Sequence, residues 1–247
     1  MADAYTYART MNEALRYDGL APQYSESDLS AFKNQTDPEL YPNVNWVKEG
    51  TRNVGENNQL NLLVRGGGSK LRYMGLLDYK NDFGLLSEQY TEYSDRYKSQ
   101  IRNYDMRLRM NIDVDLTPST QMQFGIVGVL NEAKRPNDGI STVFNNLYKV
   151  PSAAFPVKTS NNIWGSNLLN KMNPLAAIAD QGYYQTNWRK LEANMRIMQD
   201  LSMVLKGLKA EAAVGYDNTA TFWEDGYKSY QYEVTSYSDE TGRVSTV

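Results

Sequence analysis

Apolar and polar residues alternate along much of the chain, most clearly between Tyr104 and Leu116. Every even-numbered residue in this run is apolar, and every odd-numbered residue is polar. A period of two is typical of a β-strand that has one apolar and one polar face. We therefore expect a strand here, with seven side chains on its apolar face: Tyr104, Met106, Leu108, Met110, Ile112, Val114 and Leu116.

The same period returns elsewhere and predicts about six or seven strands between residues 57 and 247. The alternating stretches begin near residues 57, 71, 121, 189, 208 and 228. The connections alternate in length, since 66–70 and 117–120 are short whereas 80–99 and 132–186 are long. Outer-membrane β-barrels alternate short periplasmic turns with long external loops in this way. The pattern favours an all-β fold, an antiparallel transmembrane β-barrel fragment with 80–99 and 132–186 as external loops.

Residues 1–56 follow a different pattern and are expected to form a partly helical or irregular segment leading into the barrel. The apolar residues of 2–17 recur at helical spacing, and Ser25 or Ser27 can cap a second, shorter helix. Pro38 and Pro42 then interrupt helical structure. The sequence thus divides into this segment, 1–56, and a partial β-barrel, 57–247.

A glycine-rich stretch, GGGSK at residues 66–70, raises the question of a nucleotide site. A P-loop has the spacing GxxxxGK[ST] and joins a buried strand to a helix. Here the spacing differs and another alternating stretch follows, so we expect a hairpin turn. The glycines and the serine are expected to supply the positive φ that tight turns use.

The composition narrows the possible chemistry. The 247 residues include no cysteine and no histidine, which excludes disulfides, Cys/His zinc sites and His-dependent nucleophiles. The net charge of −3 gives no reason to expect a nucleic acid as partner. No apolar stretch is long enough for a transmembrane helix, and residues 1–19 lack the basic and apolar regions of a signal peptide. We expect no cofactor and no metal.

Several stretches of the sequence, taken in order, resemble the motifs of one protein family. One stretch follows the order NEA…DG…YS…D…YPN of the family's motif: NEALRYDGLAPQYSESDLSAFKNQTDPELYPNVNW. The family often has Asp before the Trp of this motif, and this chain has Asn45 there. A second stretch is similar to a glycine-rich hairpin of the family: NQLNLLVRGGGSKLRYMGLLDYKNDFGLL. Leu63 and Arg65 lie where the family usually has small polar residues. VPSAAFPV, NPLA, GYY and DLSMVLKGLKAEAAVGYDN match further signatures. Together they resemble the SusC/RagA family of TonB-linked outer-membrane transporters.

The resemblance implies part of a TonB-dependent importer of glycans or peptides in the outer membrane of a Gram-negative cell. It implies a 22-stranded barrel in lipid, a SusD-like surface lipoprotein as partner, and energy from TonB–ExbB–ExbD. These last proteins would act through an N-terminal part that this chain lacks. We therefore expect the plug domain, the TonB box and the rest of the barrel to lie outside this chain.

Charged residues share the polar side of the 104–116 strand: Asp105, Arg107, Arg109, Asp113 and Asp115. They fit contact with a plug domain or a substrate in the lumen. They also fit pairing with charges on neighbouring strands, which is general in polar barrel lumens. We favour the pairing, and we assign no substrate-binding residue.

Aromatic residues offer two further candidates. Tyr227, Tyr230, Tyr232 and Tyr237 fit a sugar-stacking surface, but we favour an interfacial girdle or packing. Trp164 lies in the second long loop and fits ligand binding or loop packing equally well.

Adjacent carboxylates, Glu224-Asp225 and Asp239-Glu240, are the residues that a glycosidase would use. A retaining glycosidase needs two carboxyls in one cleft, whereas adjacent residues on a strand point to opposite faces. We therefore expect no enzyme and no catalytic residues. The alternative function is a soluble β-sandwich carbohydrate-binding module, which explains the tyrosines and the alternation but explains the long strands and the alternating connection lengths less well.

Overall fold

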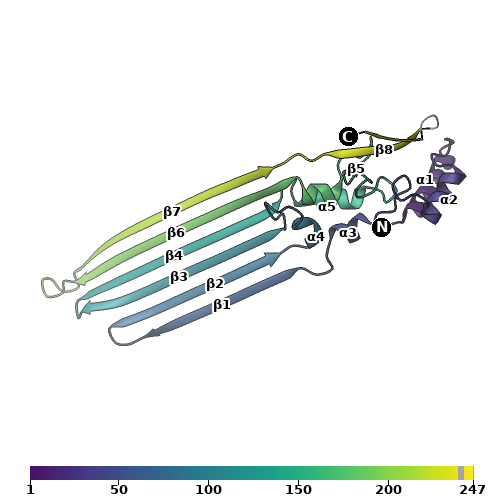
Figure 1. Ribbon diagram of the computed structural model, residues 1–247. Coiled ribbons are helices and arrows are strands. Elements are labelled where there is room, and N and C mark those ends of the chain that lie inside the picture. Colours follow the sequence, from purple (N-terminus) through teal and green to yellow (C-terminus); the bar gives the residue numbers. More distant parts are fainter. Residues whose placement is uncertain (239–241, 247) are drawn as a thin grey trace.

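One long antiparallel sheet is the largest element of the molecule, and a cap of helices and short strands lies at one end (Figure 1). The computed structural model describes residues 1–238 and 242–246. Six strands lie in the order β1-β2-β3-β4-β6-β7, so β1 and β7 are edges and the described sheet is open. Their bounds are β1 Glu56–Gly67, β2 Leu71–Phe83, β3 Arg102–Thr117, β4 Thr120–Pro136, β6 Gly182–Asp200 and β7 Lys209–Tyr227. An antiparallel, mostly β architecture is therefore confirmed, although the prediction was all-β beyond residue 56 and the long connections also contain helices.

Short turns join the strands at the end of the sheet remote from the cap (Figure 1). The Gly68 N–H donates to the Leu71 carbonyl over 2.7 Å, so the glycine-rich stretch is a hairpin, as predicted. The expected reason was wrong, because no residue of 66–70 has a positive φ. Gly67 is needed for space instead, since a Cβ there would lie 2.6 Å from the Leu71 carbonyl oxygen.

The two long connections are shorter than the sequence predicted, because the strands reach further into them. β2 continues to Phe83, β4 continues to Pro136, and β6 begins at Gly182. The connections are therefore 84–101 and 137–181, instead of 80–99 and 132–186. The first residues of β6 carry polar or aromatic side chains on both faces, so their sequence lacks the apolar alternation that marks the rest of the strand.

These connections fold into the cap, which has its own hydrophobic core. Trp46, Leu147 and Leu175 are completely buried there. The Trp46 indole also donates to the Pro151 carbonyl over 3.0 Å, which joins the N-terminal segment to the second connection. The cap contains α3 (Trp46–Gly50), α4 (Glu88–Thr91), α5 (Ile140–Lys149), β5 (Trp164–Ser166) and α6 (Pro174–Ala179).

Two helices precede the cap, α1 (Ala4–Tyr17) and α2 (Glu26–Asn34), as predicted. Ser25 is the N-cap residue of α2 and forms a capping box with Asp28, so the N-cap residue is Ser25 and not Ser27. The two helices bury Phe32 in a second small core that includes a residue of the second connection. No helix in the described part of the chain is long and apolar enough to cross a membrane.

The strand predicted near residue 228 does not extend the long sheet. β8 (Tyr232–Ser238) pairs in parallel with β5 and antiparallel with β9 (Gly242–Thr246). These strands form a separate three-stranded sheet beside the cap helices (Figure 1). The predicted seventh barrel strand is thus wrong, because its backbone pairs with the second long connection and not with β7.

Candidate functional site

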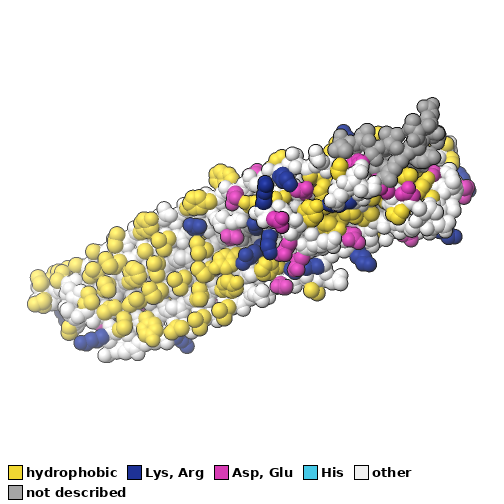
Figure 2. All heavy atoms as spheres, in the orientation of Figure 1, with side chains coloured by type: hydrophobic (Ala, Val, Ile, Leu, Met, Phe, Trp, Pro, Cys, Tyr) yellow, Lys and Arg dark blue, Asp and Glu magenta, His cyan; other side chains and the backbone are white. Residues whose placement is uncertain are grey.

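An apolar band crosses one face of the long sheet (Figure 2). The strand register aligns the predicted apolar residues of each strand into five successive rows. Within these rows, Arg189 and Asn218 are the exceptions to apolar side chains or glycine. The rows are Leu60-Tyr79-Met106-Leu130-Arg189-Ala220, Leu62-Leu77-Leu108-Gly128-Leu191-Asn218, Val64-Gly75-Met110-Ile126-Ala193-Tyr216, Gly66-Tyr73-Ile112-Phe124-Met195-Val214 and Leu71-Val114-Met122-Ile197-Ala212.

The band is exposed and has a definite height. Leu108 is 47% exposed and Met110 is 37% exposed, although both are large apolar residues in the middle of the sheet. From Met106 to Val114 the band covers eight residue steps, which is roughly 27 Å along a strand. Soluble monomers rarely expose contiguous apolar patches beyond a few hundred Å². The face therefore has the character of a surface that meets an apolar environment.

The cap-side boundary of the band is aromatic and charged. Tyr79 and Tyr104 meet edge to face there, with ring centroids 5.6 Å apart. The next rows toward the cap bring charged residues such as Arg102 and Glu132 onto the same face. Figure 2 shows this change from the apolar band to mixed charges between the sheet and the cap. Aromatic residues that border an apolar band are typical of a membrane interface.

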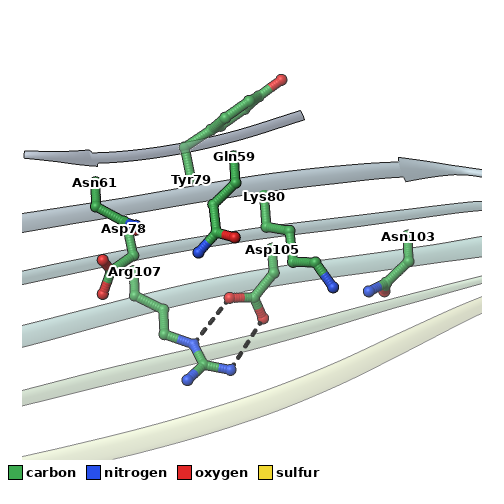
Figure 3. A pocket seen from close by; sticks show the side chains of 8 residues that line it. All are labelled: Gln59, Asn61, Asp78, Tyr79, Lys80, Asn103, Asp105 and Arg107. Atoms are coloured by element: carbon green, nitrogen blue, oxygen red, sulfur yellow. Dashed lines mark hydrogen bonds and ion pairs between the residues drawn. The ribbon is translucent and has the colours of Figure 1, made fainter. Parts of the chain in front are cut away.

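The opposite face of the sheet is polar and contains a shallow hollow near the cap side. Side chains of β1, β2 and β3 line it: Gln59, Asn61, Asp78, Lys80, Asn103, Asp105 and Arg107. Figure 3 shows these side chains on one side of the sheet and Tyr79 pointing to the other. Around this hollow the two faces of β1, β2 and β3 are thus chemically separate, as the alternation predicted.

The five predicted charged residues of β3 all lie on this polar face, but only some are paired. Asp105 accepts from Arg107 on its own strand, with 2.8 Å between Nε and Oδ1. Asp115 pairs across strands with Arg72 at 3.2 Å. No ion pair involves Arg109 or Asp113 among the described residues. The cross-strand pairing that we favoured therefore accounts for Asp115, whereas Asp105 and Arg107 pair within their own strand.

An apolar patch interrupts the polar face. In the sequence, its residues appeared only as irregularities in the apolar–polar alternation of their strands. Leu63, Leu76, Arg109 and Val127 lie in one row across β1 to β4. Met74 lies in the adjacent row on β2, directly opposite Arg65. Leu63 is half exposed, so this patch is open to contact. Only the register could place these residues together, because they come from four strands.

The aromatic candidates lie in different environments and do not form one surface. Tyr227 is exposed at the end of β7, whereas Tyr230 packs against the cap core and its hydroxyl accepts from the Asn173 N–H over 3.1 Å. Tyr232 pairs with Trp164 between β8 and β5, and the side chain of Tyr237 lies outside the described residues. Trp164 is only 4% exposed and belongs to the cap core, which favours packing over ligand binding.

The carboxylate pair on β7 does not converge on a cleft. Glu224 lies opposite Gln185 and Asp225 opposite Tyr184, so the two carboxyls project from opposite faces of the sheet. The second pair, Asp239-Glu240, lies outside the described residues. No cluster of three or more acidic residues that could hold a metal ion occurs within the described part of the chain.

One carboxyl in the cap is partly buried and only partly paired. Asp138 accepts through Oδ1 from the Gln181 amide over 2.7 Å, whereas Oδ2 has no hydrogen-bond partner among the described atoms. Burial raises the pKa of the Asp138 carboxyl above its ordinary value. Burial also raises the pKa of the nearby Tyr230 hydroxyl to about 12. The second connection therefore holds a carboxyl that binds its proton more tightly than an exposed aspartate does.

Comparisons with known proteins add no assignment. No protein-family model matches the chain, and no curated protein matches its sequence. The resemblance to SusC/RagA transporters therefore enters below as part of a proposal, together with the two faces of the sheet.

Proposed function

We propose that the chain forms part of the wall of a TonB-dependent outer-membrane transporter of the SusC/RagA type. The observation that carries the proposal is the exposed apolar band across the six strands. Its height of roughly 27 Å along the strands corresponds to about 19–22 Å along the membrane normal at a strand tilt of about 35–45°, which is comparable to the apolar band of about 25 Å in outer-membrane barrels. The apolar face meets lipid, and the polar face lines a lumen filled with water.

The strands and turns support the same proposal. β6 and β7 each have 19 residues, far longer than the five or six usual in soluble sheets. The short turns would lie on the periplasmic side and the cap on the outer side. The free edges of β1 and β7 cannot remain unpaired in lipid, so further strands of the transporter pair with them in the cell, and in a refolded sample neighbouring copies of the chain pair with them.

The cargo and partners follow from the resemblance. The transporter imports glycans or peptides, with energy from TonB–ExbB–ExbD through a part outside this chain. A SusD-like lipoprotein contacts the outer side, where the cap lies. The alternative is a soluble carbohydrate-binding module. That function needs a second sheet or another layer over the apolar band, and within the described residues the small sheet lies beside the cap instead (Figure 1).

Lipid partitioning tests the membrane part of the proposal. The chain, refolded with lipid vesicles, should stay with the vesicles after an alkaline wash. The double variant Leu108→Glu/Met110→Glu should lose this association, because two charges would enter the apolar band. The matched double variant Arg107→Glu/Arg109→Glu changes the same strand on the polar face and should remain bound. Release of the unaltered chain by the wash would contradict the proposal.

The partner part needs a separate experiment. Affinity purification from native outer membranes, with a tag in the exposed loop 201–208, should recover a SusD-like lipoprotein. Recovery of the chain as a soluble protein without such a partner would favour the carbohydrate-binding module.

A further inference from the structure

Two tryptophans lie on the polar face of the sheet, where the surrounding side chains are hydrophilic. Trp188 of β6 is opposite Thr221, and Trp223 of β7 is opposite Thr186. They are therefore diagonal neighbours on adjacent strands, which places their side chains roughly 7–8 Å apart at the backbone end. Both lie level with the cap-side boundary of the apolar band, one row apart. On the proposed wall this position is the outer mouth of the lumen.

Both indole rings are available to a ligand. Trp223 is 69% exposed, and Trp188 is partly exposed. By contrast, the nearby ring of Tyr184 is covered by the Arg135 guanidinium at 4.6 Å. Within the described residues, neither indole N–H donates a hydrogen bond and neither ring has an aromatic or cationic neighbour. A large apolar ring in a hydrophilic surface loses nothing by packing against a ligand and gains the burial of its area.

The side chains in the same two rows suit hydroxyl groups. Trp188 lies between Asn131 of β4 and Thr221 of β7, and Trp223 lies beside Thr186 of β6, with Ala133 next in that row. The Asn131 amide and the two threonine hydroxyls are donors and acceptors of the kind that sugar hydroxyls need.

The charged groups near the tryptophans are largely engaged within the surface. Lys190 of β6 pairs with Glu192 at 2.5 Å, and the Asp225 carboxylate accepts from the Asn137 side-chain amide. The Arg135 guanidinium donates to two backbone carbonyls. A neutral ligand with both an apolar face and hydroxyl groups fits best.

We infer that Trp188 and Trp223 form a stacking surface for neutral glycans on the lumen side of the wall. The C–H face of a pyranose ring packs against each indole, and the neighbouring Asn131 amide and the Thr186 and Thr221 hydroxyls bind its hydroxyls. The position at the lumen rests on the proposed function, but the sugar-binding chemistry rests on the polar face alone. The inference selects glycans over peptides as the cargo of this site.

Tryptophan fluorescence can test the inference directly. The chain has four tryptophans, and Trp46 and Trp164 are buried in the cap. Acrylamide quenching therefore reports mainly on Trp188 and Trp223. In the detergent-refolded chain, at least one of four neutral hexasaccharides (maltohexaose, cellohexaose, xylohexaose and mannohexaose) should protect the rings from acrylamide. Hexaalanine should give no protection.

Variants separate stacking from a general effect on the fold. Trp188→Ala or Trp223→Ala should weaken binding of the protecting glycan, measured by calorimetry, roughly five- to tenfold each, as loss of one aromatic contact predicts. Trp223→Tyr should restore most of the affinity. Phe222→Ala removes an exposed aromatic of the same strand on the opposite face and should leave binding unchanged.

The outcomes distinguish this inference from the proposed function. If no hexasaccharide protects the rings, or if the alanine variants bind normally, the glycan site is wrong while the vesicle result still stands. Protection by the peptide instead would also overturn the inference. If the chain binds glycans but leaves the vesicles in the alkaline wash, the sugar site holds and the transporter proposal falls.

Discussion

Met110 and Asn111 are consecutive residues of β3, yet their side chains belong to the two opposite surfaces of the sheet. Met110 lies in a row with Gly75 and Ile126, and Asn111 lies in a row with Met74 and Gly125. Such a pair gives a test of the lipid-facing surface in which position along the strand is constant.

Arginine at position 110 should destabilise the lipid-bound chain by about 2–4 kcal/mol, because the charge would lie near the middle of the apolar band. Arginine at position 111 should cost much less, since that side chain faces water. Urea unfolding of both variants in vesicles gives the two free energies. A covered core of a soluble protein would also penalise Met110→Arg, so the environment itself must be measured.

Spin labels on single cysteines identify that environment, and the chain has no native cysteine to interfere. A label at residue 110 should relax with lipid-soluble oxygen, and a label at residue 111 with a water-soluble nickel chelate. Equal responses of both labels to the chelate would remove the lipid-facing assignment.

The first hairpin should depend on Gly67 for space. Alanine at this position would place its Cβ 2.6 Å from the Leu71 carbonyl oxygen, which is backbone and cannot rotate away. We expect Gly67→Ala to destabilise the refolded chain by about 1–3 kcal/mol. Gly68→Ala is the matched control, because nothing lies within 4 Å of its Cβ. Similar unfolding midpoints in urea for the two variants would contradict this role.

The cap should depend on Trp46. Its side chain is fully buried against Phe155, with ring centroids 5.1 Å apart, and its N–H is bonded to a carbonyl. Trp46→Ala should destabilise the cap by about 3–5 kcal/mol through lost burial and a residual cavity. Limited proteolysis should then cut within residues 137–181 while the strands remain protected. Tyr148→Ala, at an exposed position of α5, should leave the digestion pattern unchanged.

Neutralising Asp138 should stabilise the cap in a pH-dependent way. Its pKa is raised in the folded state, so the stability contributed by its protonated form is present below pH 3.8 and lost as pH rises through the raised value. Asp138→Asn keeps an oxygen for the Gln181 amide and removes the charge. The variant should therefore melt at a higher temperature than the unaltered chain at pH 7 and at the same temperature near pH 3.

Asp95→Asn is the control for this measurement, because it removes the same charge from an exposed position. It should not change the melting temperature difference between pH 3 and pH 7. A lower melting temperature for Asp138→Asn at pH 7 would mean that the charged carboxylate stabilises the cap.

The sequence by itself determined the strands and their two faces. Along β3, every residue on the apolar side was predicted from a period of two, because a strand turns successive side chains to opposite faces whatever it packs against. The same local logic gave α1, α2 and the first hairpin. A helix N-cap such as Ser25, or a turn such as 66–70, depends only on residues a few positions away in the sequence.

Only the tertiary structure decided which residues lie next to one another on neighbouring strands. The rows that join Trp188 to Asn131, or Leu63 to Arg109, depend on the register between strands, and no single strand encodes that register. The cap was also missed, because Trp46, Leu147 and Leu175 are far apart in the chain and their contact carries no period. The placement of β8 in the long sheet was wrong for the same reason. Its partner β5 lies within a connection in which no apolar–polar alternation marks a strand.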